Sequence, residues 1–122
     1  MMSPVRRYSI LLCYFLFICF LFFLPGKAFP QAGNWMGAIH FDKWVHLGIF
    51  ALLTYITCWT VNVKNFKFFV LVCMVAAAYG LIVEFIQDHF IPNRSLDLGD
   101  WAADIAGSLA GIWCWSAWQG KK

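Results

Sequence analysis

The stretch from Glu84 to Asp104, EFIQDHFIPNRSLDLGDWAAD, decides the fold because it places five of the six acidic residues between two long apolar runs. Placing charged side chains at membrane depth costs free energy, so such residues are usually functional. We therefore expect this stretch to supply most of one polar site in an otherwise apolar protein.

Composition defines the class of protein around that stretch. Hydrophobic residues make up 62% of the 122-residue chain and charged residues only 12%, against roughly a quarter in soluble proteins. A soluble core of this size cannot bury so much apolar surface, so we predict one integral membrane domain over residues 1–122. The basic residues form no stripe along which a nucleic acid backbone would lie, which argues against nucleic acid binding.

Four apolar segments predict an all-α membrane protein, a four-helix antiparallel bundle with spans near residues 8–24, 44–63, 68–87 and 101–118. The first segment gives about 26 Å of helix at 1.5 Å per residue, enough for a span. It also resembles a signal peptide, but it exceeds the usual apolar core and lacks a clear cleavage site. We favour an uncleaved span, followed by an irregular loop over residues 25–41 and short turns at residues 62–67 and 92–95.

The basic residues predict the orientation. With the N-terminus inside, six of them lie on the inner side and three on the outer side, which favours N-in and C-in topology. All acidic residues and all histidines then fall at the outer end. The inner set is Arg6, Arg7, Lys64, Lys67, Lys121 and Lys122, and the outer set is Lys27, Lys43 and Arg94.

The second span opens with Asp42, Lys43 and His46. Asp42 and His46 are four residues apart and share a helix face, so they can meet. We expect Asp42 to cap the helix. For His46 two interpretations stay open, a hydrogen-bonded bundle histidine and a proton carrier controlled by a carboxylate.

The third and fourth spans each carry acidic residues on one face. Glu84 lies with Gly80 and Gln87, one turn inside the boundary, where its charge needs an offset such as Arg94, His46 or protonation. Asp100 has the position of an N-cap, whereas Asp104, one turn deeper, does not. The predicted ligand-binding set is Asp42, Lys43, His46, Glu84, Gln87, Arg94, Asp97, Asp100 and Asp104, and the catalytic candidates are Glu84, His46 and Asp104.

The chemistry of the predicted site stays open. Two helix N-termini and two cations suit an anionic headgroup, but six acidic residues oppose it and suit a proton, a cation or a bridging magnesium or calcium ion. Because the sequence has no HExxH motif, no Ser/His/Asp set and no glycine-rich phosphate loop, we assign no resident metal or cofactor.

The motifs together resemble those of the VanZ-like family of small bacterial membrane proteins. The matching segments are Asp42-Lys43-Trp44-Val45-His46, Glu84-Phe85-Ile86-Gln87, Arg94-Ser95, Asp97-Leu98-Gly99-Asp100 and the glycine-rich Gly107 to Gly111. Family members often have Pro-Gly-Arg where this chain has Pro92-Asn93-Arg94, and Asn where it has Asp104. The resemblance implies a multi-pass protein of the bacterial cytoplasmic membrane. The name-giving member of the family is associated with low-level resistance to the glycopeptide teicoplanin, an association that does not extend automatically to this shorter chain.

Three functions stay open. The first is a non-enzymatic envelope protein whose outer site binds an envelope lipid or a peptidoglycan-related group, and we favour it over an enzyme. The second is a membrane-embedded hydrolase or transferase that uses Glu84 or His46 as general acid or base. The third is a small proton-coupled transporter. The polar residues also fit a purely structural network.

The expected partners are membrane lipids, including a lipid-linked envelope precursor. Gly107 and Gly111 form a small-x-x-x-small motif on the last span, which is typical of close helix packing. We expect this motif either to pack inside the bundle or to support a homo-oligomer.

Overall fold

The computed structural model describes residues 3–23, 41–62, 65–90 and 98–120, apart from the side chains of Phe41, Asp42 and Gly120. These residues form four α-helices, in agreement with the predicted all-α architecture: α1 (Pro4–Phe22), α3 (Phe41–Val61), α4 (Phe66–Phe90) and α5 (Leu98–Gly120). Of the loop predicted over residues 25–41, Phe41 belongs to α3 and residues 25–40 lie outside the described residues, as does the turn predicted at residues 92–95.

Local signals set several helix ends. Ser3 caps α1 by accepting a hydrogen bond from the Arg6 backbone N–H, and Pro4 follows in the first turn, where its missing N–H costs nothing. Asn62 has a φ of 59°, a left-handed conformation that ends helices. The Asn65 side chain accepts a hydrogen bond from the Lys67 backbone N–H and so caps α4.

Three boundary expectations are corrected by the helices. Asp42 and Asp100 have helical backbone, so neither holds the N-cap position that we expected. Lys67 belongs to α4 and not to the preceding turn, because α4 begins at Phe66. Spacing within a pattern of apolar residues locates a helix well, whereas its first turn depends on capping contacts.

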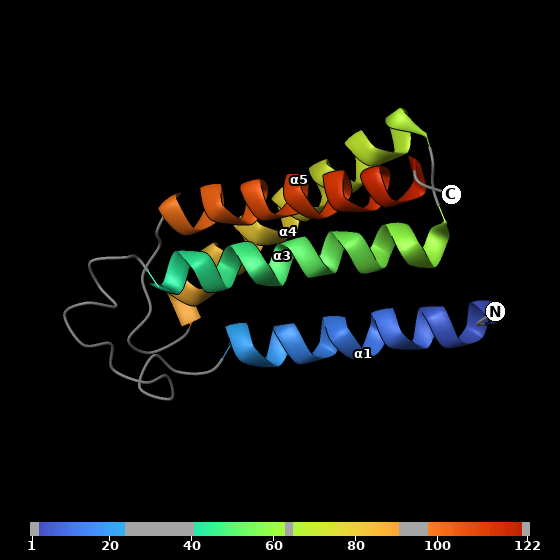
Figure 1. Ribbon diagram of the computed structural model, residues 1–122. Helices are drawn as coiled ribbons and strands as arrows, with labels where there is room; N and C mark the ends of the chain where they lie inside the picture. Colours follow the sequence, from blue (N-terminus) through green and yellow to red (C-terminus); the bar gives the residue numbers. More distant parts are fainter. Residues whose placement is uncertain (1–2, 24–40, 63–64, 91–97, 121–122) are drawn as a thin grey trace.

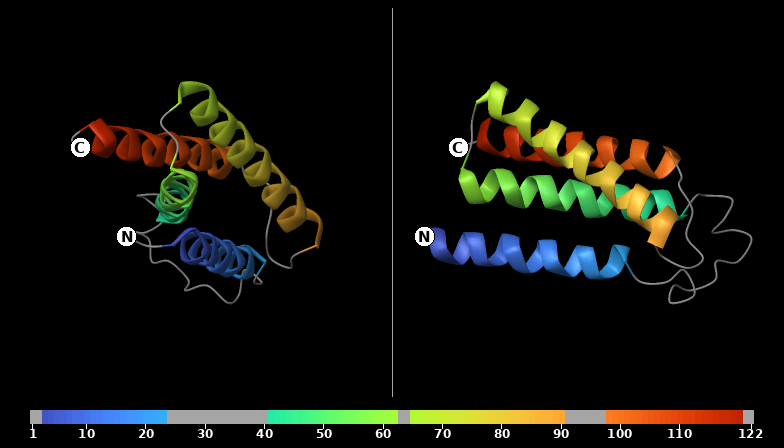
Figure 2. Two further views of the ribbon diagram at one scale, coloured as in Figure 1. Left: turned by 90° about the vertical axis from the view of Figure 1, so that its right-hand side faces the viewer. Right: turned by 180° about the vertical axis from the view of Figure 1, so that it is seen from behind.

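The helices run alternately in opposite directions, so the beginning of α1 and the end of α5 lie at one end of the bundle (Figure 1). Figure 2 shows α3 between the other helices and α4 inclined across the bundle. α3 contacts each of the other three helices, and its most extensive contact is with α5. The antiparallel arrangement that we predicted is therefore confirmed for the described helices.

The α3–α5 contact is close because α5 lacks side chains where it meets α3. A Cβ atom on Gly107 would collide with the Leu47 carbonyl, and one on Gly111 would collide with the Ala51 carbonyl and the Thr54 hydroxyl. The face that carries Gly107 and Gly111 thus packs against α3 of the same chain, which confirms the expectation that it packs inside the bundle.

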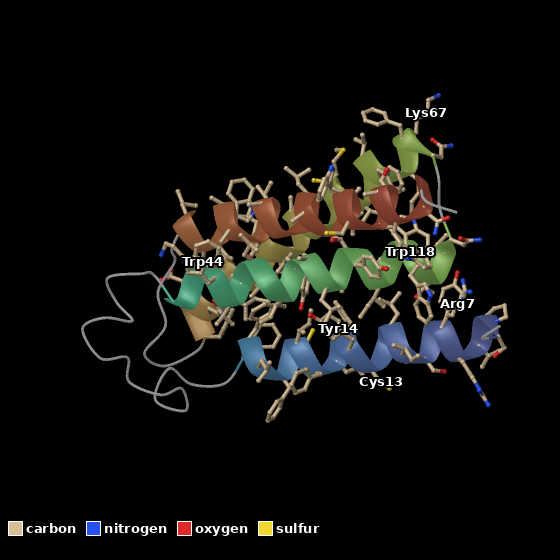
Figure 3. The ribbon with its side chains drawn as sticks, viewed as in Figure 1. Arg7, Cys13, Tyr14, Trp44, Lys67 and Trp118 are labelled. Carbon is tan, nitrogen blue, oxygen red and sulfur yellow. The ribbon has the colours of Figure 1, made fainter. Side chains whose placement is uncertain are left out.

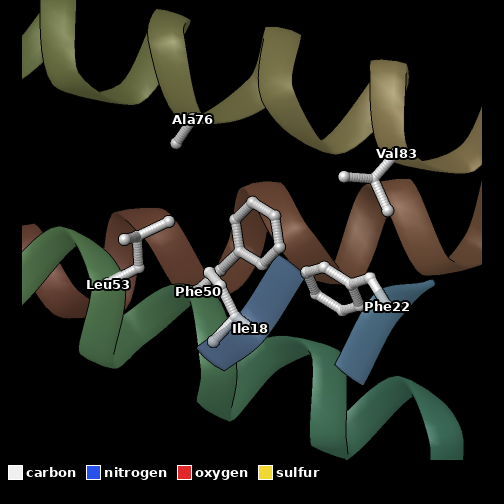
Figure 4. Close-up of a cluster of buried hydrophobic side chains, with 6 residues drawn as sticks. All are labelled: Ile18, Phe22, Phe50, Leu53, Ala76 and Val83. Atoms are coloured by element: carbon white, nitrogen blue, oxygen red, sulfur yellow. The ribbon is translucent and has the colours of Figure 1, made fainter. Parts of the chain in front are cut away.

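The core has two parts. One lies between α1, α3 and α4 and contains Ile18, Phe22, Phe50, Leu53, Ala76 and Val83 (Figure 4). The second lies toward the opposite end from the polar site and contains Cys58, Val72, Ile112 and Trp115.

The outside of the bundle is apolar as well. Many large hydrophobic side chains, such as Leu16, Met74 and Trp113, are exposed. α1, α3 and α4 are long and apolar enough to cross a membrane, so the protein is a candidate membrane protein. α5 is of similar length but includes Asp100 and Asp104 and does not meet the same criterion.

Candidate functional site: a buried polar cluster at one end of the bundle

The start of α3, the end of α4 and the start of α5 lie at the same end of the bundle (Figure 1). Each contributes one buried ionisable side chain: His46 from α3, Glu84 from α4 and Asp104 from α5. One ligand atom from each of the three lies within 4.8 Å of the others. We call these three residues the polar cluster.

His46 has carboxylates on both sides of its ring. Its Nδ1 lies 2.8 Å from Asp104 Oδ1, a hydrogen bond between buried groups. Its Nε2 lies 3.7 Å from Asp100 Oδ2, within ion-pair distance when the ring is protonated. A histidine held in this way has a fixed ring orientation and can share a proton with a carboxylate.

Lys43 and Asp100 form the more open edge of the site. Lys43 Nζ donates a hydrogen bond of 3.4 Å to Asp100 Oδ1, and the two side chains are 31% and 14% exposed. By contrast, Glu84 and Asp104 are at most 1% exposed. The Lys43–Asp100 pair is therefore the more exposed part of the site, and the carboxylates of Glu84 and Asp104 are buried.

The end of α1 packs against His46. The Phe22 ring stacks on the His46 ring with centroids 5.3 Å apart. Gln87 holds this end in place, because its Nε2 donates a 2.7 Å hydrogen bond to the Phe22 carbonyl. Gln87, which we predicted as a ligand residue, thus supports the site through α1.

Hydrogen bonds hold Asp104 and α5 in register. Ser108 Oγ donates to the Asp104 carbonyl at 2.8 Å, and Thr54 Oγ1 donates to the Ser108 carbonyl at 3.0 Å. On the other side, Trp101 Nε1 donates to the Ala77 carbonyl of α4 at 2.8 Å. Rigid helices therefore fix the position of the carboxylate.

Most of the described residues that we predicted for the site come together there. Lys43, His46, Glu84, Asp100 and Asp104 gather at one end, and Gln87 is buried there against the end of α1. His46 on α3 is hydrogen-bonded to Asp104 on the neighbouring helix α5. The described contacts do not test the predicted pairing of His46 with Asp42. Arg94, Asp97 and the side chain of Asp42 lie outside the described residues.

Two further residues contribute to the site, and the sequence pattern indicated at most the helix face of one of them. Phe22 is one of many aromatic residues in a uniformly apolar segment, so nothing in the pattern singles it out. Gly80 lies against Asp104: a Cβ at Gly80 would be 2.8 Å from Asp104 Oδ2. Its spacing of four residues from Glu84 predicted that the two share a helix face. The sequence did not predict that Asp104 of α5 would be its neighbour.

No protein-family profile, curated protein or solved structure matches this chain. The chemistry of the site is therefore read from its residues. A histidine hydrogen-bonded to a buried carboxylate, with a second carboxylate nearby, can store a proton, orient an imidazole as a general base or bind a cation.

Proposed function

We propose that this chain is a multi-pass protein of the bacterial cytoplasmic membrane whose polar site, on the outer face, binds an envelope lipid headgroup or a peptidoglycan-related group. The observation that carries the proposal is the convergence of Lys43, His46, Glu84, Asp100 and Asp104 at one end of an apolar bundle. Burial of ionisable groups in a membrane protein is costly and typical of functional sites.

The proposal includes α5 as the fourth span and N-in, C-in topology. α5 packs along α3, so it crosses the bilayer if α3 does. Arg7 and Lys67 lie at the end of the bundle where the chain begins and ends (Figure 3). An excess of basic residues at that end favours its placement in the cytoplasm.

A headgroup with a phosphate or a carboxylate suits the exposed edge of this site. Lys43 is partly exposed there, and the first turns of α3 and α5 lie at the same end of the bundle (Figure 1). Helix N-termini carry partial positive charge and backbone N–H groups that bind anions.

The resemblance to the VanZ-like family supports the same proposal, because the motifs that carry it contain the residues of the site. A link to teicoplanin resistance is the part of the proposal that rests on the resemblance alone.

Replacement of Lys43 tests the headgroup proposal. We expect Lys43→Gln to weaken retention of anionic envelope lipids by about tenfold, since a hydrogen bond to a charged group contributes about 1.5–3 kcal/mol. Native mass spectrometry of the full chain, with lipid-linked precursor and phosphatidylglycerol in separate titrations, measures the retention.

Lys67→Gln is the matched control, because Lys67 is exposed at the opposite end of the bundle. We expect it to retain lipid as the wild type does. Equal loss in both variants would mean that general charge attracts the lipid and that the site does not bind it. A preference for the precursor over phosphatidylglycerol would identify an envelope intermediate as the ligand.

A further inference from the structure

The polar cluster has the donor set of a metal centre. Imidazole nitrogen from His46 and carboxylate oxygens from Glu84 and Asp104 come from three different helices and lie within 4.8 Å of one another. All three side chains are buried, with 6%, 0% and 1% of their surface exposed. Spacing along the sequence did not indicate a metal, because the three residues are far apart in the chain.

A second observation concerns the other oxygen of Asp104. Oδ1 meets His46, but Oδ2 is buried and accepts no hydrogen bond from any of the described residues. It points toward Gly80 of α4, one turn from Glu84 on the same helix face. A buried carboxylate oxygen without a donor is destabilising, and a cation between α4 and α5 would satisfy it.

We propose that His46, Glu84 and Asp104 bind one divalent first-row transition metal ion, zinc or manganese. The imidazole nitrogen favours these ions over magnesium and calcium, which prefer oxygen ligands. Three protein ligands leave at least one coordination position open for water or a ligand atom, as in catalytic rather than structural zinc sites. Asp100 lies behind His46 Nε2 at 3.7 Å, in the place of a carboxylate that orients a metal-bound imidazole.

Metal binding requires the side chains of the polar cluster to move. His46 Nδ1 and Asp104 Oδ1 are 2.8 Å apart, whereas two ligands of tetrahedral zinc lie roughly 3.3 Å apart, given bonds of about 2.0–2.1 Å. Metal binding therefore breaks this hydrogen bond and moves the two atoms apart by about half an ångström. Ligand atoms of the cluster that lie up to 4.8 Å apart must move closer together. The inference goes beyond the proposed function, since metal binding requires no headgroup.

Metal content of the purified full-length protein tests the inference. The protein is purified in detergent with a tag that contains no histidine, equilibrated with zinc, manganese or magnesium, and passed through a desalting column. We expect about one zinc or manganese per chain and no retained magnesium. His46→Gln, Glu84→Gln and Asp104→Asn should each lower the affinity by about tenfold or more, because even loss of an outer partner costs 10–100-fold.

Asp88→Asn is the matched control, because Asp88 is a half-exposed carboxylate one turn beyond Glu84 on α4. It should bind metal as the wild type does. Equal retention by the wild type and all three ligand variants would overturn the assignment, as would a wild type that retains no metal.

Cobalt spectroscopy of the wild type covers the case in which the ligand variants do not fold. We expect visible d–d bands from one equivalent of cobalt in the detergent-purified wild type, displaced by zinc. Absence of these bands in folded wild-type protein overturns the inference without any variant. A wild-type protein that binds metal as expected but retains no envelope lipid would instead refute only the proposed function.

Discussion

At the scale of single residues, Gly80 decides whether the polar cluster can form. Its missing side chain leaves the space that the Asp104 carboxylate occupies, because a Cβ there would lie 2.8 Å from Oδ2 and 3.3 Å from the Asp104 Cβ. The nearest atom is Oδ2, the end of the Asp104 side chain, and the Cβ comes next, so a substitution displaces the carboxylate from its place or pushes α4 and α5 slightly apart.

We expect Gly80→Ala to lower the free energy of unfolding by about 1–3 kcal/mol, the range for overpacking of a buried site. Unfolding in mixed micelles, followed by tryptophan fluorescence, measures the change. The same variant should also weaken metal retention, since it displaces the Asp104 carboxylate.

Gly48→Ala is the control for Gly80→Ala. A Cβ at Gly48 meets no atom within 4 Å, so alanine adds helix propensity without a clash, and stability should stay the same or rise by up to about 1 kcal/mol. If Gly80→Ala is as stable as Gly48→Ala, the close approach of α4 and α5 at this point is not required for folding.

At the scale of helices, the α3–α5 pair forms the framework of the bundle. Gly107 and Gly111 let the two backbones approach closely, and the Thr54 hydroxyl donates across the contact to the Ser108 carbonyl. Close approach of small residues is a main source of helix association in membranes. His46 and Asp104 lie on this pair, so the geometry of their hydrogen bond depends on it.

We expect Gly111→Ala to destabilise the fold by at least about 1–3 kcal/mol, because the new Cβ would meet the Ala51 backbone carbonyl, which cannot rotate away. The midpoint of thermal unfolding in detergent, measured by circular dichroism, reports the change. Ala106→Leu on the exposed side of α5 adds more volume and should leave the midpoint nearly unchanged. Comparable losses in the two variants would show that α5 tolerates no added volume anywhere and that the glycine contact is not special.

At the scale of the whole molecule, the charges are separated along the bundle axis. Lys43, Asp100 and the polar cluster occupy one end, and Arg7 and Lys67 occupy the other (Figure 3). Arg7 is held there by a hydrogen bond to the Trp59 carbonyl and by the Trp59 ring, 5.0 Å from its guanidinium carbon. Such an asymmetry favours one orientation in a membrane.

We expect both termini to face the cytoplasm, because the basic end of the bundle is retained there. Green fluorescent protein fused to either terminus should be fluorescent, and alkaline phosphatase fused after residue 120 should be inactive. Alkaline phosphatase fused after residue 90 should be active, which provides the control. Active phosphatase at both positions would mean that α5 does not cross the membrane.

The sequence by itself determined the class of the fold and the location of its polar groups. Long apolar runs require helices in a membrane because backbone groups need internal hydrogen bonds there. The period of the helix placed Gly80, Glu84 and Gln87 on one face, and the order of the segments placed that face at the same end as His46 and Asp104. Helix positions followed to within a few residues, apart from the first turns.

Only the tertiary structure decided which of these groups meet. His46 is hydrogen-bonded to Asp104, 58 residues away in the chain, a contact that no spacing within one helix indicates. The reason is the rotation of each helix about its axis, which the contacts of Gly107 and Gly111 with α3 set. A repeat of 3.6 residues per turn defines a face but not the neighbour that the face meets. That neighbour depends on packing between helices that are distant in the chain, and it turns scattered polar residues into one site.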